Sequence, residues 1–121
     1  MKSRDTSHNR TIGRWGEKAA AQYLADQGYK LIGSNIRTPY GEIDLIVRRE
    51  DMTVFVEVKT RTSASFGLPE EAVSARKMEH MLNAAHYYAA GNGIDHWQID
   101  VISVEGRPGT IPVFTHFENI A

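Results

Sequence analysis

The chain has 121 residues, 41% of them hydrophobic and 24% charged, which indicates one ordinary globular domain and argues against wholesale disorder. Its formal net charge of −1 argues against a general nucleic-acid-coating protein, and the absence of cysteine excludes disulfides, thiolate nucleophiles and cysteine-ligated metal centres. No apolar run is long enough to span a membrane and none follows the first residues, so we expect no membrane segment, no secretory signal and a cytoplasmic location.

Basic residues gather at the beginning of the chain. The first 61 residues carry eleven Lys and Arg against eight Asp and Glu, whereas the remaining 60 carry three against seven. Residues 1–9 are polar and aperiodic, so we expect a flexible basic arm there and a single domain over residues 10–121. Together with Arg10 and Arg14, this arm is suited to contact phosphates. A solvated terminus without a partner is the alternative.

A helical pattern follows the arm, from about Thr11 to Gln27. Apolar side chains recur there at spacings of three and four residues, and Gly28 stands where a helix often ends. The next segment, Tyr29 to Ile36, predicts a short strand, and residues 38–41 then supply turn chemistry.

Two alternating segments come next, Glu42 to Arg48 and Thr53 to Lys59. The short link between them predicts an antiparallel hairpin whose register places Ile46 opposite Phe55. The residues expected on its core face are Ile43, Leu45, Val47, Val54, Val56 and Val58.

The last third of the chain predicts one helix and two strands. Pro69 suits the first turn of a helix that ends near Gly91. Residues 97–103 alternate like a strand, and residues 112–117 suggest a last strand at an edge. The order αβββαββ predicts an α/β domain in which helices flank a small mixed sheet.

The second face of the hairpin carries acidic residues. The same register places Asp44 opposite Glu57, and directly opposed residues have Cβ atoms about 4.5–5.5 Å apart. Two carboxylates at that separation repel unless a cation lies between them, and oxygen-only ligation favours Mg²⁺ or Mn²⁺. Lys59 stands one pleat beyond Glu57, where an ammonium group can hold attacking water or stabilise charge on a phosphate.

Each of these residues also has a structural alternative. Glu57 and Lys59 could form a same-face surface ion pair, and Asp44 could cap a neighbouring turn. Their placement on adjacent strands, between runs of buried Val and Ile, favours a site.

Residues 41–46 and 54–61 resemble the YraN-type family of small bacterial proteins. That family is similar to archaeal Holliday-junction resolvases of the restriction-endonuclease-like, PD-(D/E)xK superfamily. The resemblance covers nearly the whole chain, from residues 13–17 to residues 98–102, and the two hairpin motifs are its specific part. It implies a restriction-endonuclease-like core.

The resemblance also implies roles for individual residues. Asp44 and Glu57 match the metal ligands, and Lys59 matches the catalytic lysine. Glu17 matches a position where resolvase-like nucleases often place an additional acidic residue. Ile43 departs from the superfamily pattern, which has a proline before the first aspartate.

Other residues are candidates for contact with nucleic acid. Arg61 and Ser63 follow the site in a predicted loop, where they would either contact phosphate or simply form a polar connection. Lys77 on the second helix could flank a nucleic-acid groove, although Glu79 nearby weakens that interpretation. For Asp100 we favour a structural hydrogen-bonding role over that of a ligand.

The candidate cation site and the family resemblance together imply a Mg²⁺- or Mn²⁺-dependent nuclease that hydrolyses phosphodiesters in DNA, with branched or irregular structures as the expected substrates. A junction cutter needs two sites, which favours a two-fold homodimer. The alternative is a non-catalytic nucleic-acid-binding module of the same fold. A third hypothesis, an adaptor that docks through its acidic C-terminal half, leaves the repulsion between Asp44 and Glu57 unexplained.

Overall fold

The computed structural model describes residues 2–62 and 74–121, with side chains from Arg10 onward. The order of elements in these residues is αβββαββ, as predicted. The elements are α1 (Lys2–Asp26), β1 (Lys30–Thr38), β2 (Gly41–Arg49), β3 (Met52–Arg61), α2 (Ala75–Gly91), β4 (Trp97–Glu105) and β5 (Val113–Phe117).

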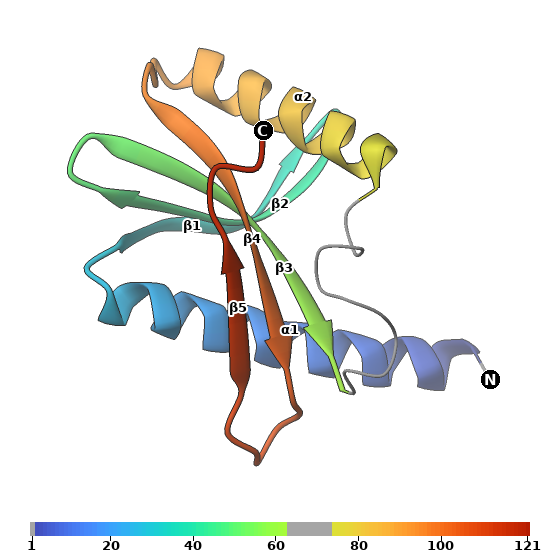
Figure 1. Cartoon of the computed structure of the whole chain (residues 1–121). Helices are drawn as coiled ribbons and strands as arrows, with labels where there is room; N and C mark the ends of the chain where they lie inside the picture. Colours follow the sequence, from blue (N-terminus) through green and yellow to red (C-terminus); the bar gives the residue numbers. More distant parts are fainter. Residues whose placement is uncertain (1, 63–73) are drawn as a thin grey trace.

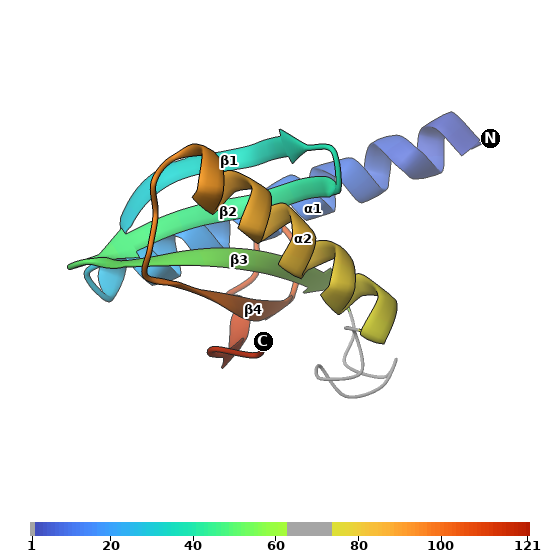
Figure 2. The ribbon, with the colours of Figure 1, turned by 90° about the horizontal axis from the view of Figure 1, so that it is seen from above.

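The five strands form one mixed sheet in the order β1-β2-β3-β4-β5. β3 and β4 are parallel, and every other neighbouring pair is antiparallel. The parallel pair requires a crossover connection, and α2 lies within it. Figure 1 shows α1 and α2 on opposite faces of the sheet, and Figure 2 shows α2 crossing the strands obliquely. The α/β class and the mixed sheet flanked by helices are therefore confirmed.

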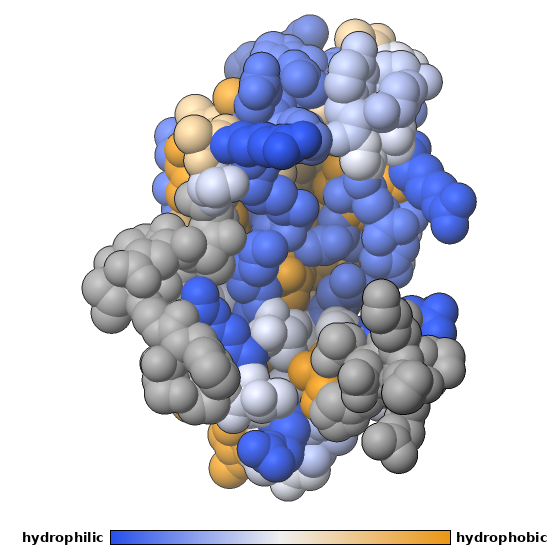
Figure 3. All heavy atoms as spheres, turned by 90° about the vertical axis from the view of Figure 1, so that its right-hand side faces the viewer, coloured by the Kyte–Doolittle hydropathy of each residue, from blue (hydrophilic) through white to orange (hydrophobic). Residues whose placement is uncertain are grey.

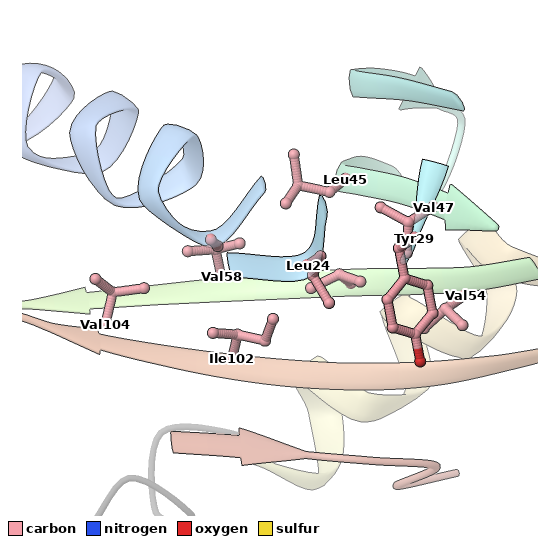
Figure 4. Packing of buried hydrophobic residues seen from close by; sticks show 10 residues of the cluster. Leu24, Tyr29, Leu45, Val47, Val54, Val58, Ile102 and Val104 are labelled. Carbon is pink, nitrogen blue, oxygen red and sulfur yellow. The ribbon is translucent and has the colours of Figure 1, made fainter. Parts of the chain in front are cut away.

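Each face of the sheet buries its own apolar cluster against one helix. On the α1 face, Leu24 and Ala20 are fully buried against aliphatic side chains of the sheet (Figure 4). Those side chains are Leu45, Val47, Val54, Val56, Val58, Ile102 and Val104. On the α2 face, three alanines of the helix pack against Ile43, Ile46, Phe55 and Ile99. Small residues on α2 bring that helix close to the strands.

The helix α1 approaches β3 closely at one glycine. A Cβ atom on Gly16 would overlap the hydroxyl group of Thr60, so only glycine fits at this contact. Gly13, one turn earlier, has open space around its Cα. The close approach at Gly16 brings the following residue, Glu17, beside the end of β3.

The helices begin at different residues from those predicted. α1 begins at Lys2 rather than near Thr11, because no glycine or proline interrupts the chain before Gly13. The residues expected to form a flexible arm are thus the first turns of α1, and the division into arm and domain stays a prediction. α2 begins at Ala75, and the predicted first turn at Pro69 lies outside the described residues.

The N-terminus of α2 has a side-chain cap. The hydroxyl oxygen of Ser74 accepts a hydrogen bond from the backbone N–H of Lys77 at 3.1 Å. This bond satisfies one of the amide groups left without a helical partner at the start of a helix. It also fixes the first turn of α2, from which the side chain of Lys77 extends. Neither helix in the described part of the chain is long and apolar enough to cross a lipid bilayer.

Candidate active site

The strands β2 and β3 separate at a fork, and the acidic residues lie there. The register is as predicted at Ile46 and Phe55, but the last paired residues are Leu45 and Val56. Beyond them, β2 stays paired with β1, and β3 stays paired with β4. The predicted pairing of Asp44 with Glu57 therefore falls just past the end of the ladder.

Asp44 compensates for the lost pairing. Its carboxylate oxygen Oδ2 accepts a hydrogen bond of 2.8 Å from the backbone N–H of Val58. This amide points toward β2 at the fork, and without the carboxylate it would lack an acceptor. The bond fixes the orientation of the Asp44 side chain between the two strands.

The fork also corrects one prediction about the core. Ile43 was expected to share a face with Leu45 and Val47, but it packs in the cluster against α2. The regular alternation fails because β2 has left β3 at this point. Asn35, at the neighbouring position of β1, has a positive φ of 49°, which marks an irregularity in that strand as well.

Asp44 and Glu57 form a carboxylate pair. Glu57 is only 7% exposed, and its side chain follows Phe55 on the α2 face of β3. Burial, as the largest cause, and the negative charge of Glu57 together raise the pKa of Asp44 from 3.8 to about 7. The Val58 hydrogen bond and the charge of Lys77 act in the opposite direction. Two carboxylates are thus held close together in a partly dry place.

Two lysines lie against Glu57. The Nζ atom of Lys59 is 3.6 Å from Glu57 Oε2, and the Nζ atom of Lys77 is 3.3 Å from the same oxygen. The structure thus brings Lys59 to Glu57, whose charge also acts on Asp44, and the catalytic roles of these three residues stay predictions. Sequence reasoning placed Lys77 on a nucleic-acid groove and missed its contact with Glu57, because the distance between β3 and α2 could not be read from a pattern.

Glu17 lies at the edge of this cluster. The Nδ2 atom of Asn35 donates to Glu17 Oε1 at 3.1 Å and to Glu42 Oε1 at 3.4 Å. The negative charge of Glu17 contributes to raising the pKa of Asp44. Asn35 was missed from the sequence. The sequence did offer one indication of its role, because asparagine tolerates positive φ and here stands within a segment predicted as a strand.

Glu17 lines two of the surface hollows beside α1. The arginine hollow is lined by Arg10, Gly13, Arg14, Glu17, Asn35, Arg37 and Glu42. The second hollow is lined by Ile12, Gly13, Glu17, Val58, Lys59, Thr60 and Thr62. Arg10, Arg14 and Arg37 are exposed. Figure 3 shows the side of the molecule on which β3 ends and α2 begins, and the coloured atoms there are mainly hydrophilic, with small apolar patches between them.

The remaining predicted contact residues lie farther along β3. Arg61 is the last residue of that strand, two positions beyond Lys59. Ser63 lies outside the described residues. Asp100, on β4, is fully buried and accepts hydrogen bonds from Gln98 Nε2 and the backbone N–H of Asn119, each at 2.9 Å. Its hydrogen-bonding role is thus confirmed.

The carboxylate pair suits a hard divalent cation. In the described part of the chain, no three His, Asp or Glu side chains lie close enough together to form a metal cage. Mg²⁺ does not require one, since it is commonly held by one or two carboxylates while water and phosphate oxygens complete its shell. Asp44 and Glu57 fit that arrangement. The geometry does not group Glu17 with them as a third ligand, and that role stays a prediction.

Fold and site together define a small α/β domain with a carboxylate pair and two lysines at a fork in a mixed sheet. The family model described as "Uncharacterised protein family UPF0102" matches residues 16–104. The chain belongs to this family, which is the YraN-type family that the hairpin motifs resemble.

Similar proteins come from several bacteria. A UPF0102 protein of Syntrophotalea carbinolica is 50% identical over 99 residues, covering 80% of each chain. One from Syntrophomonas wolfei is 54% identical over 80 residues, covering 66% of this chain and 70% of the relative. One from Caldanaerobacter subterraneus is 45% identical over 103 residues, covering 84% of each chain. The region that the family model matches, residues 16–104, includes the fork and both acidic strands.

Proposed function

We propose that this protein is a Mg²⁺- or Mn²⁺-dependent nuclease with a restriction-endonuclease-like core, which hydrolyses phosphodiesters in DNA of branched or otherwise irregular structure. The observation that supports it most is the carboxylate pair of buried Glu57 and half-buried Asp44, with the ammonium group of Lys59 3.6 Å from Glu57. A purely structural role would not require two carboxylates to face each other in a place where burial opposes their ionisation.

The residues divide the chemistry among them. Asp44 and Glu57 would hold the cation, which when bound supplies an activated water and neutralises charge on the phosphate. The Val58 N–H fixes one oxygen of Asp44, so the other oxygen stays available to the ligand. Lys59 would hold the attacking water or stabilise the charge that develops on the phosphate oxygens.

Lys77 neutralises the carboxylate pair before the cation arrives. Its Nζ atom lies 3.3 Å from Glu57, closer than that of Lys59. With a divalent cation held by the pair, the ammonium group of Lys77 would be repelled from Glu57 and would be available to the backbone phosphate. The place of Lys77 in the first turn of α2 leaves it free to move, since its side chain is only half-buried.

The DNA backbone would follow the exposed arginines. Arg10, Arg14 and Arg37 line one hollow next to Glu17, and Arg61 and Ser63 follow Lys59 along the chain. Basic side chains in such a row bind phosphates without reading sequence. A two-fold homodimer would supply the second site that a four-way junction requires.

The alternative function is a nucleic-acid-binding module that does not cleave. The contacts of two lysines with Glu57 favour it, because an ion pair can satisfy a buried carboxylate without any metal. The two functions differ in whether phosphodiester bonds are broken.

Cleavage assays with the full chain separate them. The substrates are a four-way junction, a flap and a linear duplex, each with Mg²⁺, with Mn²⁺ or with a chelator. Wild type should cut in either cation, and Lys59→Ala should lose about 100-fold or more in rate, as expected for removal of one charge-stabilising group. Glu118→Gln, which changes an exposed carboxylate on the C-terminal segment, is the control and should cut like wild type. If wild type binds these DNA substrates but cleaves none of them with either cation, the non-catalytic nucleic-acid-binding module is the correct function.

A further inference from the structure

A pocket opens beside the candidate active site, under the first turns of α2. It is bounded by the turn between β1 and β2, by the α2 face of β2 and β3, and by α2 itself. It encloses about 440 Å³ of empty space, part of which is open to solvent. The residues that line this α2 pocket include Tyr40, Ile43, Phe55, Glu57, Lys77, His80, Met81, Ala84 and Ile99.

The floor and the rim of the α2 pocket differ in chemistry. The floor consists of buried apolar side chains, with Phe55 and Ala84 each 3% exposed. The rim carries an exposed aromatic ring, Tyr40, at 48% exposure. That ring meets the equally exposed Tyr87 of α2 edge to face, with ring centroids 6.2 Å apart. Apolar walls with a few polar groups are typical of a ligand site.

One end of the α2 pocket belongs to the candidate active site. Glu57 and Lys77 line the pocket, and the same two side chains form the ion pair beside Asp44. A ligand in the pocket would therefore continue directly into the phosphate position. This continuity favours an occupant with a flat apolar part joined to a phosphate, rather than an apolar side chain of a peptide.

We propose that the α2 pocket binds an unpaired nucleobase of the DNA strand whose phosphate lies at Asp44 and Glu57. The inference rests on the proposed function and adds a substrate class: DNA with an unpaired nucleotide beside the scissile phosphate. A base in a duplex stack cannot reach such a pocket, whereas an unpaired base enters at low cost. The ring of Tyr40 offers a stacking surface, and His80 offers a polar group for the edge of the base.

Charge at the mouth makes this binding depend on a cation. Glu42 and Glu57 both line the α2 pocket, and their carboxylates repel a nucleotide phosphate. A divalent cation held by the carboxylate pair would add two positive charges there, beyond the charge of Lys77. We therefore expect a nucleotide to bind the α2 pocket more tightly in the cation-loaded protein than in the metal-free protein.

The test measures affinity for three DNA duplexes with the full chain. One duplex contains a single unpaired 2-aminopurine, the second contains the same base fully paired, and the third has an abasic position instead. Ca²⁺ replaces Mg²⁺ so that binding can be measured apart from cleavage. Wild type should bind the unpaired base about 5- to 150-fold more tightly than the abasic duplex, the range of one stacked base.

Two variants act on the α2 pocket in different ways. Tyr40→Ala removes the exposed ring, whose loss should not affect folding, and Ala84→Leu fills the floor. Both should reduce the preference for the unpaired base toward 1-fold. Leu31→Ala truncates an apolar side chain of similar exposure, 51%, on β1 outside the pocket, and should keep the preference. If Ala84→Leu does not fold, the Tyr40→Ala variant alone still tests whether the α2 pocket binds the base.

The outcomes separate this inference from the proposed function. The pocket assignment is overturned if wild type binds the unpaired and abasic duplexes equally, or if Tyr40→Ala keeps the preference for the unpaired base. A pocket that binds a peptide instead of a base would give this result. Cleavage in Mn²⁺ without any preference for the unpaired base would support the proposed nuclease and contradict the pocket assignment. A preference without cleavage in Mn²⁺ or Mg²⁺ would keep the pocket and remove the nuclease.

Discussion

Asp44 has a structural role at the fork and, in the proposed function, would also be a metal ligand. Its oxygen Oδ2 accepts from the Val58 N–H, which closes the backbone at the fork, while the rest of the carboxylate faces Glu57. Burial and the charge of Glu57 both oppose ionisation, and they raise the pKa of Asp44 to about 7. A residue in this position is costly in the ionised state unless a cation neutralises it.

This cost predicts a pH dependence of stability in the absence of divalent cations. Between pH 3.8 and about 7, the folded protein keeps the Asp44 proton that the unfolded chain has lost. Protonation of Asp44 therefore contributes fully to the free energy of unfolding below pH 3.8, and this contribution is lost as the pH rises through about 7. Asp44→Asn keeps an acceptor for Val58 and should be more stable than wild type at pH 8, by about 2 kcal/mol.

Urea unfolding at pH 5 and pH 8 with a chelator measures this difference. The advantage of Asp44→Asn over wild type should grow between the two pH values. Asp95→Asn changes an exposed aspartate and should show no such growth. An Asp44→Asn protein less stable than wild type at pH 8 would make the carboxylate a structural requirement instead.

At the scale of elements, the site is assembled by the contact of α1 with β3 and of α2 with β3. The first contact depends on Gly16, where the helix backbone meets Thr60, and it brings Glu17 to the edge of the site. The second depends on the alanines of α2, which bring Lys77 to Glu57. Small residues therefore determine which charged residues meet.

The approach of α1 can be tested with a pair of glycine substitutions. Gly16→Ala should push α1 away from β3 and destabilise the protein by about 1–3 kcal/mol. Gly13→Ala, on the same helix with open space around it, should be neutral or stabilise by about 0.5–1 kcal/mol. Thermal unfolding of the two variants gives the comparison. Equal effects would show that Gly16 is not a tight contact.

At the scale of the whole molecule, positive and negative charge are arranged around one fork. The arginine hollow lies along α1 on one side of the carboxylate pair, and the α2 pocket lies on the other. A nucleic-acid strand that crosses the fork would meet both. Although the formal net charge is −1, the proposed function would rely on the local group of exposed arginines to attract a polyanion.

The arginine hollow predicts a salt dependence of DNA affinity. Each phosphate contact contributes about −0.9 to the slope of log K against log salt. Changing both Arg10 and Arg14 to Gln should therefore reduce the slope by about two and weaken binding of all DNA substrates alike. Arg107→Gln, an exposed arginine between β4 and β5, is the control. An unchanged slope would show that the basic start of the chain is merely solvated.

Periodicity was sufficient for the order of elements and for the register at Ile46 and Phe55. It could not locate the fork, because the end of a ladder depends on where a neighbouring strand diverges rather than on alternation. For that reason Ile43 was assigned to the wrong face. Asp44 and Glu57 were singled out because the predicted strand register places them opposite each other, whereas Glu17 was named only from the family resemblance. Lys77 at Glu57 and Asn35 at Glu17 depend on tertiary distances that no local pattern contains.

The most direct test of the account is calorimetric titration of the metal-free full chain with Mn²⁺ at pH 7.5, beside Asp44→Asn and Glu57→Gln. The carboxylate pair should bind one cation per chain in wild type, and each substitution should abolish that binding, because each removes a ligand charge. The Asp95→Asn control should bind like wild type. Wild type that binds no Mn²⁺, or variants that bind it unchanged, would contradict a metal site at Asp44 and Glu57 and with it the proposed nuclease.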